Sequence, residues 1–483
     1  MLVPVLAILA RATQGELPPG VGELIATTLA LALGSGLVAG LIGLAGAWLS
    51  VRVETPARGL LLALLVSPLA APPYLVALTW LDLGGTALHG RLVVACLLLG
   101  VCTSPLVLLV TRAAVARLDP HMEEAAALLG LGARARFFRV LLPALRPALA
   151  AGLCLVVLYA FADFGAVSAL GAKTFTRAIY FELDLGQDRA LAWSRAASLA
   201  LVLLALAIPV FALEQRARSG RFEQGGRRRA PRANLAGAIA VWALALIVFG
   251  STAGLVVVRA LWHARDLPWQ HRAWGNALEA LSNSVVWAAS AATLAVLFAL
   301  VLAWCAARLR DPFHDWMQRG ATLGFVLPGP VVALGLLLAL SASGRVGYHL
   351  EGTVVVLVAA YLVRYLPEAL QAASAGLAQA PARLEEAGRM LGLSAPASVF
   401  RVTVPMLRGS IAAGWVLVFA ASLRELPATL LLSPLGARAL SSEIWRFAKD
   451  SHYEQMAPSA LLLVALTLPA VVFILRKGHA EAA

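Results

Sequence analysis

Residues 123–132 read Glu-Glu-Ala-Ala-Ala-Leu-Leu-Gly-Leu-Gly, and residues 385–394 read Glu-Glu-Ala-Gly-Arg-Met-Leu-Gly-Leu-Ser. The second stretch follows the first at an offset of 385 − 123 = 262 positions, and the same offset relates Phe-Arg-Val at 138–140 to Phe-Arg-Val at 400–402. Two similar polar strings at one offset, in a chain otherwise rich in apolar residues, indicate an internal duplication.

Each copy has the pattern of a helix, a turn and a second helix. The paired glutamates favour the positive end of a helix dipole, at the start of a run rich in alanine and leucine. Gly130 and Gly392 allow the backbone to reverse, and Pro143 and Pro405 stand near the start of the next apolar run. The alternative is a plain connector between two membrane helices. The duplication argues against it, because connectors usually vary.

The composition excludes a soluble globular protein. Of the 483 residues, 60% are hydrophobic, which is more apolar surface than a soluble fold can bury. Runs of about 20 apolar residues, long enough to cross roughly 30 Å of hydrocarbon, recur along the whole chain. Runs this long and this continuously apolar cross a membrane as helices. The sequence therefore predicts an all-α polytopic membrane protein.

The apolar runs form two parallel repeats of about six helices each, about 11–12 transmembrane helices in all. The predicted spans are Leu24–Leu49, Leu60–Leu81, Leu92–Val110, Pro147–Leu170, Ala196–Leu213, Leu235–Leu261, Ser284–Ala307, Ala321–Leu340, Thr353–Leu366, Ile411–Leu432 and Ala460–Leu475. Met1–Ala10 is apolar but too short for a full span. We expect a first transmembrane domain at 1–214, a basic linker at 215–234 and a second transmembrane domain at 235–483.

The net charge of +13 at pH 7 does not indicate a nucleic-acid partner. Most of the Lys and Arg residues lie in short loops on one predicted side of the membrane, together with both Glu-Glu-Ala segments, the linker and the C-terminus. The positive-inside rule makes that side cytoplasmic. An even number of spans per repeat then relates the two halves by an axis along the membrane normal.

The chain lacks the residue patterns of a disulfide framework, a metal centre or a catalytic site. All four cysteines lie inside apolar runs, where they read as small core residues. The eight histidines are scattered in loops, without an H-E-x-x-H pattern or a pair at i, i+4. The paired glutamates have no partnering histidine. We therefore predict no metal, no cofactor and no enzymatic activity.

Nor does the chain hold a phosphate-binding loop of the G-x-x-x-x-G-K-[ST] type, since no Gly-Lys-Ser or Gly-Lys-Thr occurs in it. If ATP drives this protein, another polypeptide must hydrolyse the ATP. A duplicated pair of cytoplasmic helices fits docking to a partner that has two-fold symmetry.

The duplicated segments resemble the E-A-A-x3-G-x9-I-x-L-P motif of the permease subunits of binding-protein-dependent ABC importers. The first copy matches at Glu124, Ala125, Ala126, Gly130, Val140, Leu142 and Pro143, and the second at Glu386, Ala387, Gly388, Gly392, Val402, Val404 and Pro405. The second copy departs from the motif at Gly388 and Val404. In this family the helix-turn-helix seats in a cleft on the ATPase subunit. The resemblance therefore implies ATPase docking through Glu124, Ala125, Ala126, Gly130, Pro143, Glu386, Ala387, Gly388, Gly392 and Pro405.

The resemblance covers nearly the whole chain and implies a fused pair of permease domains of the type I ABC importer fold, in the ferric iron and thiamine group. The strings at 162–168, 174–176 and 423–432 resemble the ferric iron type. The implied partners are a homodimer of ATP-binding subunits, an extracytoplasmic solute-binding protein and the lipid of a bacterial inner membrane. The substrate stays open among ferric ion, a ferric chelate, thiamine and other small solutes.

Asp163 and Glu425 occupy equivalent positions, because 425 − 163 = 262, and each lies within an apolar run. An ionisable residue in a membrane helix costs roughly 2.5–3.5 kcal/mol on insertion scales, so it usually faces a cavity or a partner. One hypothesis is that both carboxylates line a translocation path, where they would attract a cation. The alternative is that Glu425 pairs with Arg424 or with another buried group. Neighbouring helix positions point about 100° apart, which disfavours a direct pair with Arg424.

Two other function classes compete with an importer permease. A secondary transporter driven by an ion gradient would explain the membrane carboxylates but leaves the duplicated segments without a task. A membrane-embedded enzyme predicts a convergent cluster of His, Asp or Glu, which the sequence does not show. The acidic residues of the outward loops either contact an external binding protein or are simply solvated; these are Asp184, Asp188, Glu443, Asp450 and Glu454.

Overall fold

The computed structural model describes residues 2–12, 17–185, 188–219, 234–265, 267–309, 317, 320–322, 324 and 326–480. Across these residues the regular secondary structure is helical and contains no β-strand. The predicted linker at 215–234 lies largely outside the described residues. The expected all-α polytopic fold is confirmed.

The helices follow one another in two sets. The first half contains α1 (Leu2–Ala12), α2 (Val21–Arg52), α3 (Arg58–Val66), η1 (Ser67–Leu69), α4 (Pro73–Gly84), η2 (Gly85–Leu88), α5 (Leu92–Arg117), α6 (Pro120–Leu128), α7 (Ala133–Arg136), η3 (Phe137–Leu141), α8 (Leu142–Ala162), α9 (Gly165–Ala169), α10 (Phe175–Leu185) and α11 (Arg189–Ser219). The second half contains α12 (Leu235–Ser251), α13 (Ala253–Ala264), α14 (Arg272–Leu309), α16 (Gly329–Ala342), α17 (Arg345–Leu350), α18 (Val354–Gln379), α19 (Ala382–Met390), α20 (Ala395–Ser398), η5 (Val399–Thr403), α21 (Val404–Leu423), α22 (Pro427–Leu432), α23 (Leu440–Lys449) and α24 (Tyr453–Ala480).

The duplication read from the sequence is also present in the helices. Helices α5 and α18 both have 26 residues, and their first residues differ by 354 − 92 = 262 positions. Both contain an internal proline, Pro105 and Pro367, at the same offset. A π-helical turn precedes the long helix in both copies, η3 before α8 and η5 before α21. The same local sequence has therefore produced the same local structure twice.

Eight helices of the described residues are long and apolar enough to cross a membrane, or ten if each of two bent pairs counts as one span. The two short apolar helices at Val3–Ala12 and Gly329–Ala342 bring each half to six hydrophobic elements. One bend interrupts the predicted span Leu60–Leu81, where the helices meet at 87°. Proline explains this break, because Pro68, Pro72 and Pro73 remove backbone donors and restrict the residues before them.

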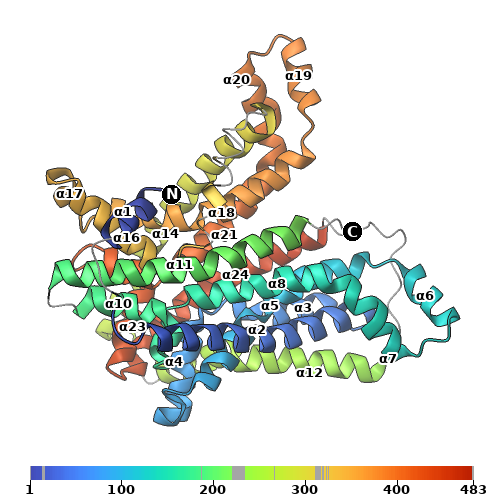
Figure 1. Cartoon of the computed structure of the whole chain (residues 1–483), viewed down its shortest axis with the longest axis horizontal. Helices are drawn as coiled ribbons and strands as arrows, with labels where there is room; N and C mark the ends of the chain where they lie inside the picture. The colour runs from blue at the N-terminus through green and yellow to red at the C-terminus, as the bar shows by residue number, and fades with distance from the viewer. Residues whose placement is uncertain are drawn as a thin grey trace. The chain divides into compact units, whose positions relative to one another are not determined.

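One compact unit consists of Pro19–Arg177 and Val202–Arg259. Within it α2, α5 and α8 run side by side (Figure 1) and pack against one another. Glycines allow the close approach: a Cβ on Gly43 of α2 would lie 2.6 Å from Val107 Cβ and 2.9 Å from the backbone nitrogen of Leu108. Helix α12, the first element of the second half, packs against α3 and α2 of this unit.

The other compact unit consists of Met1–Pro18, Ala178–Leu201 and Ala260–Ala483. Here α14, α18, α21 and α24 form the central packing. Helix α1, the first element of the first half, packs against α16, where Pro4 closely contacts Gly335. The first helix of each repeat therefore packs within the unit that holds most of the other repeat.

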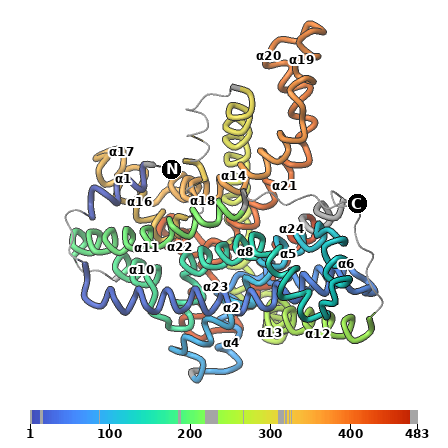
Figure 2. The backbone as a smooth tube through the Cα atoms, turned by 45° about the vertical axis from the view of Figure 1, so that its right-hand side comes forward, coloured from blue at the N-terminus to red at the C-terminus, as the bar shows by residue number. Residues whose placement is uncertain are grey.

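Helices α18 and α21 form a long hairpin in this second unit, and α19 and α20 lie at its tip (Figure 2). The corresponding segment of the first half, α6 and α7, lies at the end of the pair formed by α5 and α8 (Figure 1). Each Glu-Glu-Ala segment is thus held at the end of two packed helices, a position that can present it to a partner.

The close approach of α2 and α5 predicts the effect of a small substitution. Gly43→Ala should destabilise the protein by about 1–3 kcal/mol, because the new methyl group meets a backbone atom that cannot rotate away. Thermal unfolding of the detergent-solubilised chain measures this as a lower melting temperature. Gly22→Ala is the matched control, since Gly22 lies in the same helix with nothing within 4 Å of its Cβ position. An unchanged melting temperature for Gly43→Ala would contradict the packing described.

Candidate functional site

The turn of each Glu-Glu-Ala segment depends on one glycine in the left-handed region. Gly130 has φ of 79° and Gly392 has φ of 90°. In the first copy the N–H of Gly130 donates to Ala127 O at 3.0 Å, and the N–H of Leu131 donates to Ala126 O at 3.1 Å. This is the Schellman pattern, which satisfies the last carbonyls of α6. The second copy repeats both bonds, from the N–H of Gly392 to Arg389 O at 3.0 Å and from the N–H of Leu393 to Gly388 O at 3.1 Å. The predicted role of the two glycines as turn residues follows from their backbone conformation.

The first glutamate of each pair ties the segment to the end of an earlier long helix, α2 in the first half and α14 in the second. Glu123 Oε2 lies 2.8 Å from Arg52 Nη1, and Glu385 Oε1 lies 3.0 Å from Arg308 Nη2. Arg52 is the last residue of α2, and Arg308 stands in the last turn of α14. The side chains are only 12–17% exposed. Ion pairs this well buried hold their geometry better than exposed ones, so they fix the segments in place.

Glu385 makes further hydrogen bonds within its segment. Its carboxylate also accepts a hydrogen bond from Thr403 Oγ1 at 2.7 Å, and its backbone oxygen accepts one from Ser398 Oγ at 2.8 Å. Burial acts to raise the pKa of the Glu385 carboxyl, but the hydrogen bonds from Thr403 and Arg308 outweigh it, and the pKa lies below its ordinary value. The folded segment therefore favours the ionised form of the Glu385 side chain.

The second glutamate of each pair is exposed. Glu124 has a side chain that is 56% exposed and lies 3.5 Å from His121, and Glu386 is exposed on α19. Ala125 and Ala387 are exposed beside them, whereas Ala126 and Gly388 are buried. The same order of exposed and buried positions thus occurs in both copies.

Large apolar side chains are exposed next to these glutamates. Leu129 and Leu391 are 82% and 87% exposed, at equivalent positions. Leu128, Met390, Phe138 and Phe400 are likewise exposed. Pro143 and Pro405 stand in the first turns of α8 and α21, where a missing N–H is tolerated. Contiguous exposed apolar side chains of this kind mark an interaction surface, and here the surface occurs twice.

Asp163 stands at a break in its apolar run. Helix α8 ends at Ala162, and the short helix α9 begins at Gly165. Asp163 Oδ1 accepts hydrogen bonds from the N–H groups of Ala166 and Val167 at 3.0 and 3.1 Å. Asp163 therefore caps α9 and satisfies donors that would otherwise be left without partners. The predicted span Pro147–Leu170 is two helices instead of one.

Glu425 stands at the equivalent break, between α21 and α22, and is 4% exposed. Its Oε1 accepts the N–H of Ala428 at 3.3 Å, so it too caps a short helix. Its Oε2 accepts a hydrogen bond from Tyr365 Oη at 2.6 Å and lies 3.3 Å from Arg364 Nε. Arg424 instead donates to Ala420 O at 3.0 Å. The structure therefore gives Glu425 a buried ion-pair partner on α18.

The first half lacks the arginine and tyrosine of this cluster at the equivalent positions. Positions 102 and 103, which correspond to 364 and 365 at the offset of 262, hold Cys102 and Thr103. Gly329, at the start of α16, leaves the space for the pair, because a Cβ there would clash with Glu425 and Arg364. The two carboxylates share a capping role but have different surroundings.

Sequence reasoning missed the three arginines that form ion pairs with Glu123, Glu385 and Glu425. Arg52 and Arg308 differ by 308 − 52 = 256 positions, the offset that also relates Trp48 to Trp304, and this regularity could have identified them. Arg364 lies inside an apolar run, which alone marks it as a residue in need of a partner. Among the described residues, no group of three or more His, Cys, Asp and Glu could hold a metal ion.

Comparison with known proteins places both halves in one family. The family model of the binding-protein-dependent transport system inner membrane component matches residues 36–219 and 295–476. An Fe(3+)-transport system permease protein of Haemophilus influenzae is 29% identical over 505 residues, which cover 99% of this chain and 96% of that protein. A ferric transport system permease protein of Actinobacillus pleuropneumoniae is 24% identical. That match covers 77% of this chain and 56% of the relative's length. A probable molybdenum ABC transporter permease protein of Haloferax volcanii is 32% identical over 42% of this chain and 76% of its own length.

The buried anchor predicts that Glu385 and Glu386 respond differently to the same change. Glu385→Gln should increase backbone hydrogen exchange in residues 382–403 at pH 7, because it weakens the bonds to Arg308 and Thr403. Glu386→Gln, the matched control on the exposed neighbour, should leave that exchange unchanged. Equal exchange in both variants would contradict the anchoring role.

The pH dependence of the same measurement has a defined sign. The pKa of Glu385 is lower in the folded segment than its ordinary value of 4.5, so the ionised carboxylate stabilises the segment fully above that pH. The stabilisation is lost as the pH falls through the lower, folded pKa. After correction for intrinsic exchange rates, the wild type and Glu385→Gln should therefore differ less in the hydrogen exchange of residues 382–403 below about pH 4.5.

Proposed function

Because this chain belongs to the family of binding-protein-dependent transport system inner membrane components and contains two copies of its domain, we propose that it carries ferric iron into the cell as both permease domains of one ABC importer. Membership of the family makes the chain an importer permease in the inner membrane. The substrate rests on the relative that matches along nearly its whole length, an Fe(3+)-transport permease protein. The gradient-driven alternative is not favoured.

The observation that carries this proposal is the pair of matching interaction surfaces. Two segments at one offset end in the same glycine turn, expose the same glutamate and leucine, and bury the same small residue. A homodimer of ATP-binding subunits offers two equivalent clefts, so a permease with two equivalent segments suits it. The exposed glutamates and leucines would make the contact, while Glu123 and Glu385 hold the segments through Arg52 and Arg308.

We infer that both segments and the C-terminus face the cytoplasm and that an extracytoplasmic binding protein delivers the solute on the other face. The excess of Lys and Arg on the side of the segments supports this orientation. Closure of the ATPase homodimer would then move the two segments together. The anchors would pass that movement to the ends of α2 and α14, and so to the bundles that alternate access to the solute.

Asp163 and Glu425 are our candidates for residues on the translocation path. They cap α9 and α22 at the breaks of two equivalent spans. Glu425 is covered and paired with Arg364 in this conformation. Its part in transport therefore requires that α22 moves and separates the pair when the permease changes state.

Charge reversal tests the docking surfaces. Glu124→Lys combined with Glu386→Lys should abolish capture of the co-expressed ATPase subunit, because both changes place a cation where the partner meets an anion. Pull-down of the ATPase by the affinity-tagged full chain measures this. Glu454→Lys is the control, since Glu454 is an exposed glutamate far from both segments in sequence. Capture at the wild-type level by the double variant would contradict docking at these segments.

Neutral substitution tests the membrane carboxylates. Asp163→Asn combined with Glu425→Gln should abolish uptake of labelled ferric iron while the ATPase is still captured, because the amides keep the size of the carboxylates but remove their charge. Thermal unfolding must accompany the assay, since Glu425→Gln leaves Arg364 without its anion. A folded, assembled double variant with normal uptake would exclude both residues from the path.

A further inference from the structure

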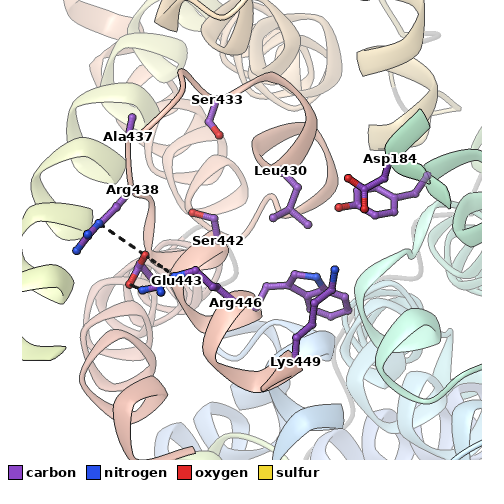
Figure 3. Close-up of a pocket in the computed structure, with 12 residues that line it drawn as sticks. Asp184, Leu430, Ser433, Ala437, Arg438, Ser442, Glu443, Arg446 and Lys449 are labelled. Carbon is purple, nitrogen blue, oxygen red and sulfur yellow. Dashed lines mark hydrogen bonds and ion pairs between the residues drawn. The ribbon is translucent and has the colours of Figure 1, made fainter. Parts of the chain in front are cut away.

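A hollow with an excess of positive charge lies among the outward-loop helices of the second unit (Figure 3). Its volume is about 510 Å³, and Arg438, Arg446 and Lys449 line it together with Asp184 and Glu443. A second hollow of about 580 Å³ shares Arg438 and Arg446 and adds Arg272. Four cations and two carboxylates therefore line two cavities that share Arg438 and Arg446, each large enough for a small ligand.

The guanidinium group of Arg446 is held in position by a buried carboxylate. Glu443 has a side chain that is 5% exposed, and its oxygens lie 2.7 Å from Arg446 Nη2 and 3.2 Å from Arg446 Nε. Arg438 Nε lies 4.0 Å from the same carboxylate. Arg446 nevertheless keeps about half of its side chain exposed to the cavity. A guanidinium held on one edge and open on the other presents a fixed fork of donors, the geometry that binds carboxylate and phosphate groups.

Lys449 adds a cation that no other side chain neutralises. In the part of the chain that the structure describes, its ammonium group has no ion pair or hydrogen bond. Figure 3 shows Lys449 and Asp184 on two different helices, α23 and α10. An unpaired lysine next to a fixed arginine leaves the cavity with a net attraction for an anion.

The membrane orientation does not explain these cations, because the positive-inside rule disfavours basic residues in the outward loops. The equivalent stretch of the first repeat also holds basic residues, Lys173, Arg177, Arg189 and Arg195. In the second repeat Arg438, Arg446 and Lys449 line one cavity. They lie at the predicted outer face, where a solute would arrive.

We propose that this cavity receives the solute as an anionic chelate, which it binds through carboxylate or phosphate oxygens, and that a bare trivalent cation is not what enters. The proposal rests on the function proposed above and names the chemical form of its cargo. Arg446 and Arg438 bind the oxyanions of the chelate in the fork geometry, and Lys449 adds a point charge. A bare Fe³⁺ would meet a surface of the same sign.

Direct binding to the full-length chain in lipid nanodiscs tests the proposal. The probes are ferric citrate, citrate alone, inorganic phosphate and, as a bare trivalent cation, Tb³⁺. We expect saturable binding of the citrate probes or of phosphate, weakened by added salt, and no competition by Tb³⁺; comparison of citrate with phosphate identifies which oxyanion the cavity prefers. Each lost charge-assisted contact should weaken anion binding roughly tenfold in Lys449→Gln and further in Arg446→Gln with Lys449→Gln.

Two substitutions serve as controls. Arg446→Lys keeps the charge but loses the fork, and should weaken binding less than Arg446→Gln. Arg345→Gln removes a predicted outward arginine that lines neither cavity and should change nothing. Because Arg446→Gln also leaves Glu443 without its closest cation, Lys449→Gln alone decides the outcome if the double variant does not fold.

Three results would overturn the inference. The first is wild-type anion binding in Lys449→Gln and in the double variant. The second is tight Tb³⁺ binding that Asp184→Asn abolishes, which would make the cavity a cation site. The third is a Lys449→Gln variant that binds anions as the wild type does but no longer captures the solute-loaded binding protein. That result would make the surface a protein-docking site. ATPase capture through Glu124 and Glu386, measured on the same preparations, tests the proposed function separately.

Discussion

Inside a membrane domain no water is available to bond a free backbone group, so every interruption of a helix must be satisfied by the protein itself. Two equivalent spans are interrupted here, after Ala162 and after Leu423. Within two residues of each break stands a carboxylate, Asp163 or Glu425. It accepts hydrogen bonds from N–H groups of the short helix that follows. These carboxylates thus support the fold before they can serve transport. A short helix held by one capping side chain is also an element that can move when that bond changes, which is why the breaks are reasonable places for a gate.

Few contacts also hold the surfaces that are predicted to meet the ATPase. A helix-turn-helix at the tip of two long helices has little core of its own, so its position depends on few contacts. The Arg52–Glu123 and Arg308–Glu385 pairs supply them, and they join the segments to the ends of α2 and α14. The two glutamates of each pair therefore have different roles. Glu123 and Glu385 are largely buried and hold the segments, whereas Glu124 and Glu386 are exposed. A force applied to the segment then reaches the long helix through a short, stiff connection.

The sequence predicted the all-α fold, the two repeats and the glycine turns, because these depend on composition, spacing and local backbone preference. It did not predict the breaks at Asp163 and Glu425, since hydropathy describes side chains and both runs stay apolar across the break. Nor did it predict the Arg364–Glu425 pair, whose members are 61 residues apart; the position equivalent to Arg364 in the other half holds Cys102. The packing of α1 on α16 and of α12 on α3 is likewise a long-range choice. Single-sequence periodicity carries no information on which distant helix an apolar face will cover.

The two repeats have remained alike where a symmetric partner would require it and have diverged elsewhere. The exposed and buried positions of the predicted docking segments agree residue by residue, as they must if each segment meets an identical cleft. A small solute has no such symmetry and occupies one site at a time. At the membrane carboxylates the repeats accordingly differ, because position 364 holds Arg and the equivalent position 102 holds Cys. Fusion of two permease domains into one chain permits this, because each half can then acquire charges that its twin lacks. A homodimeric permease would carry every such charge twice, and the asymmetric cluster around Glu425 could not arise.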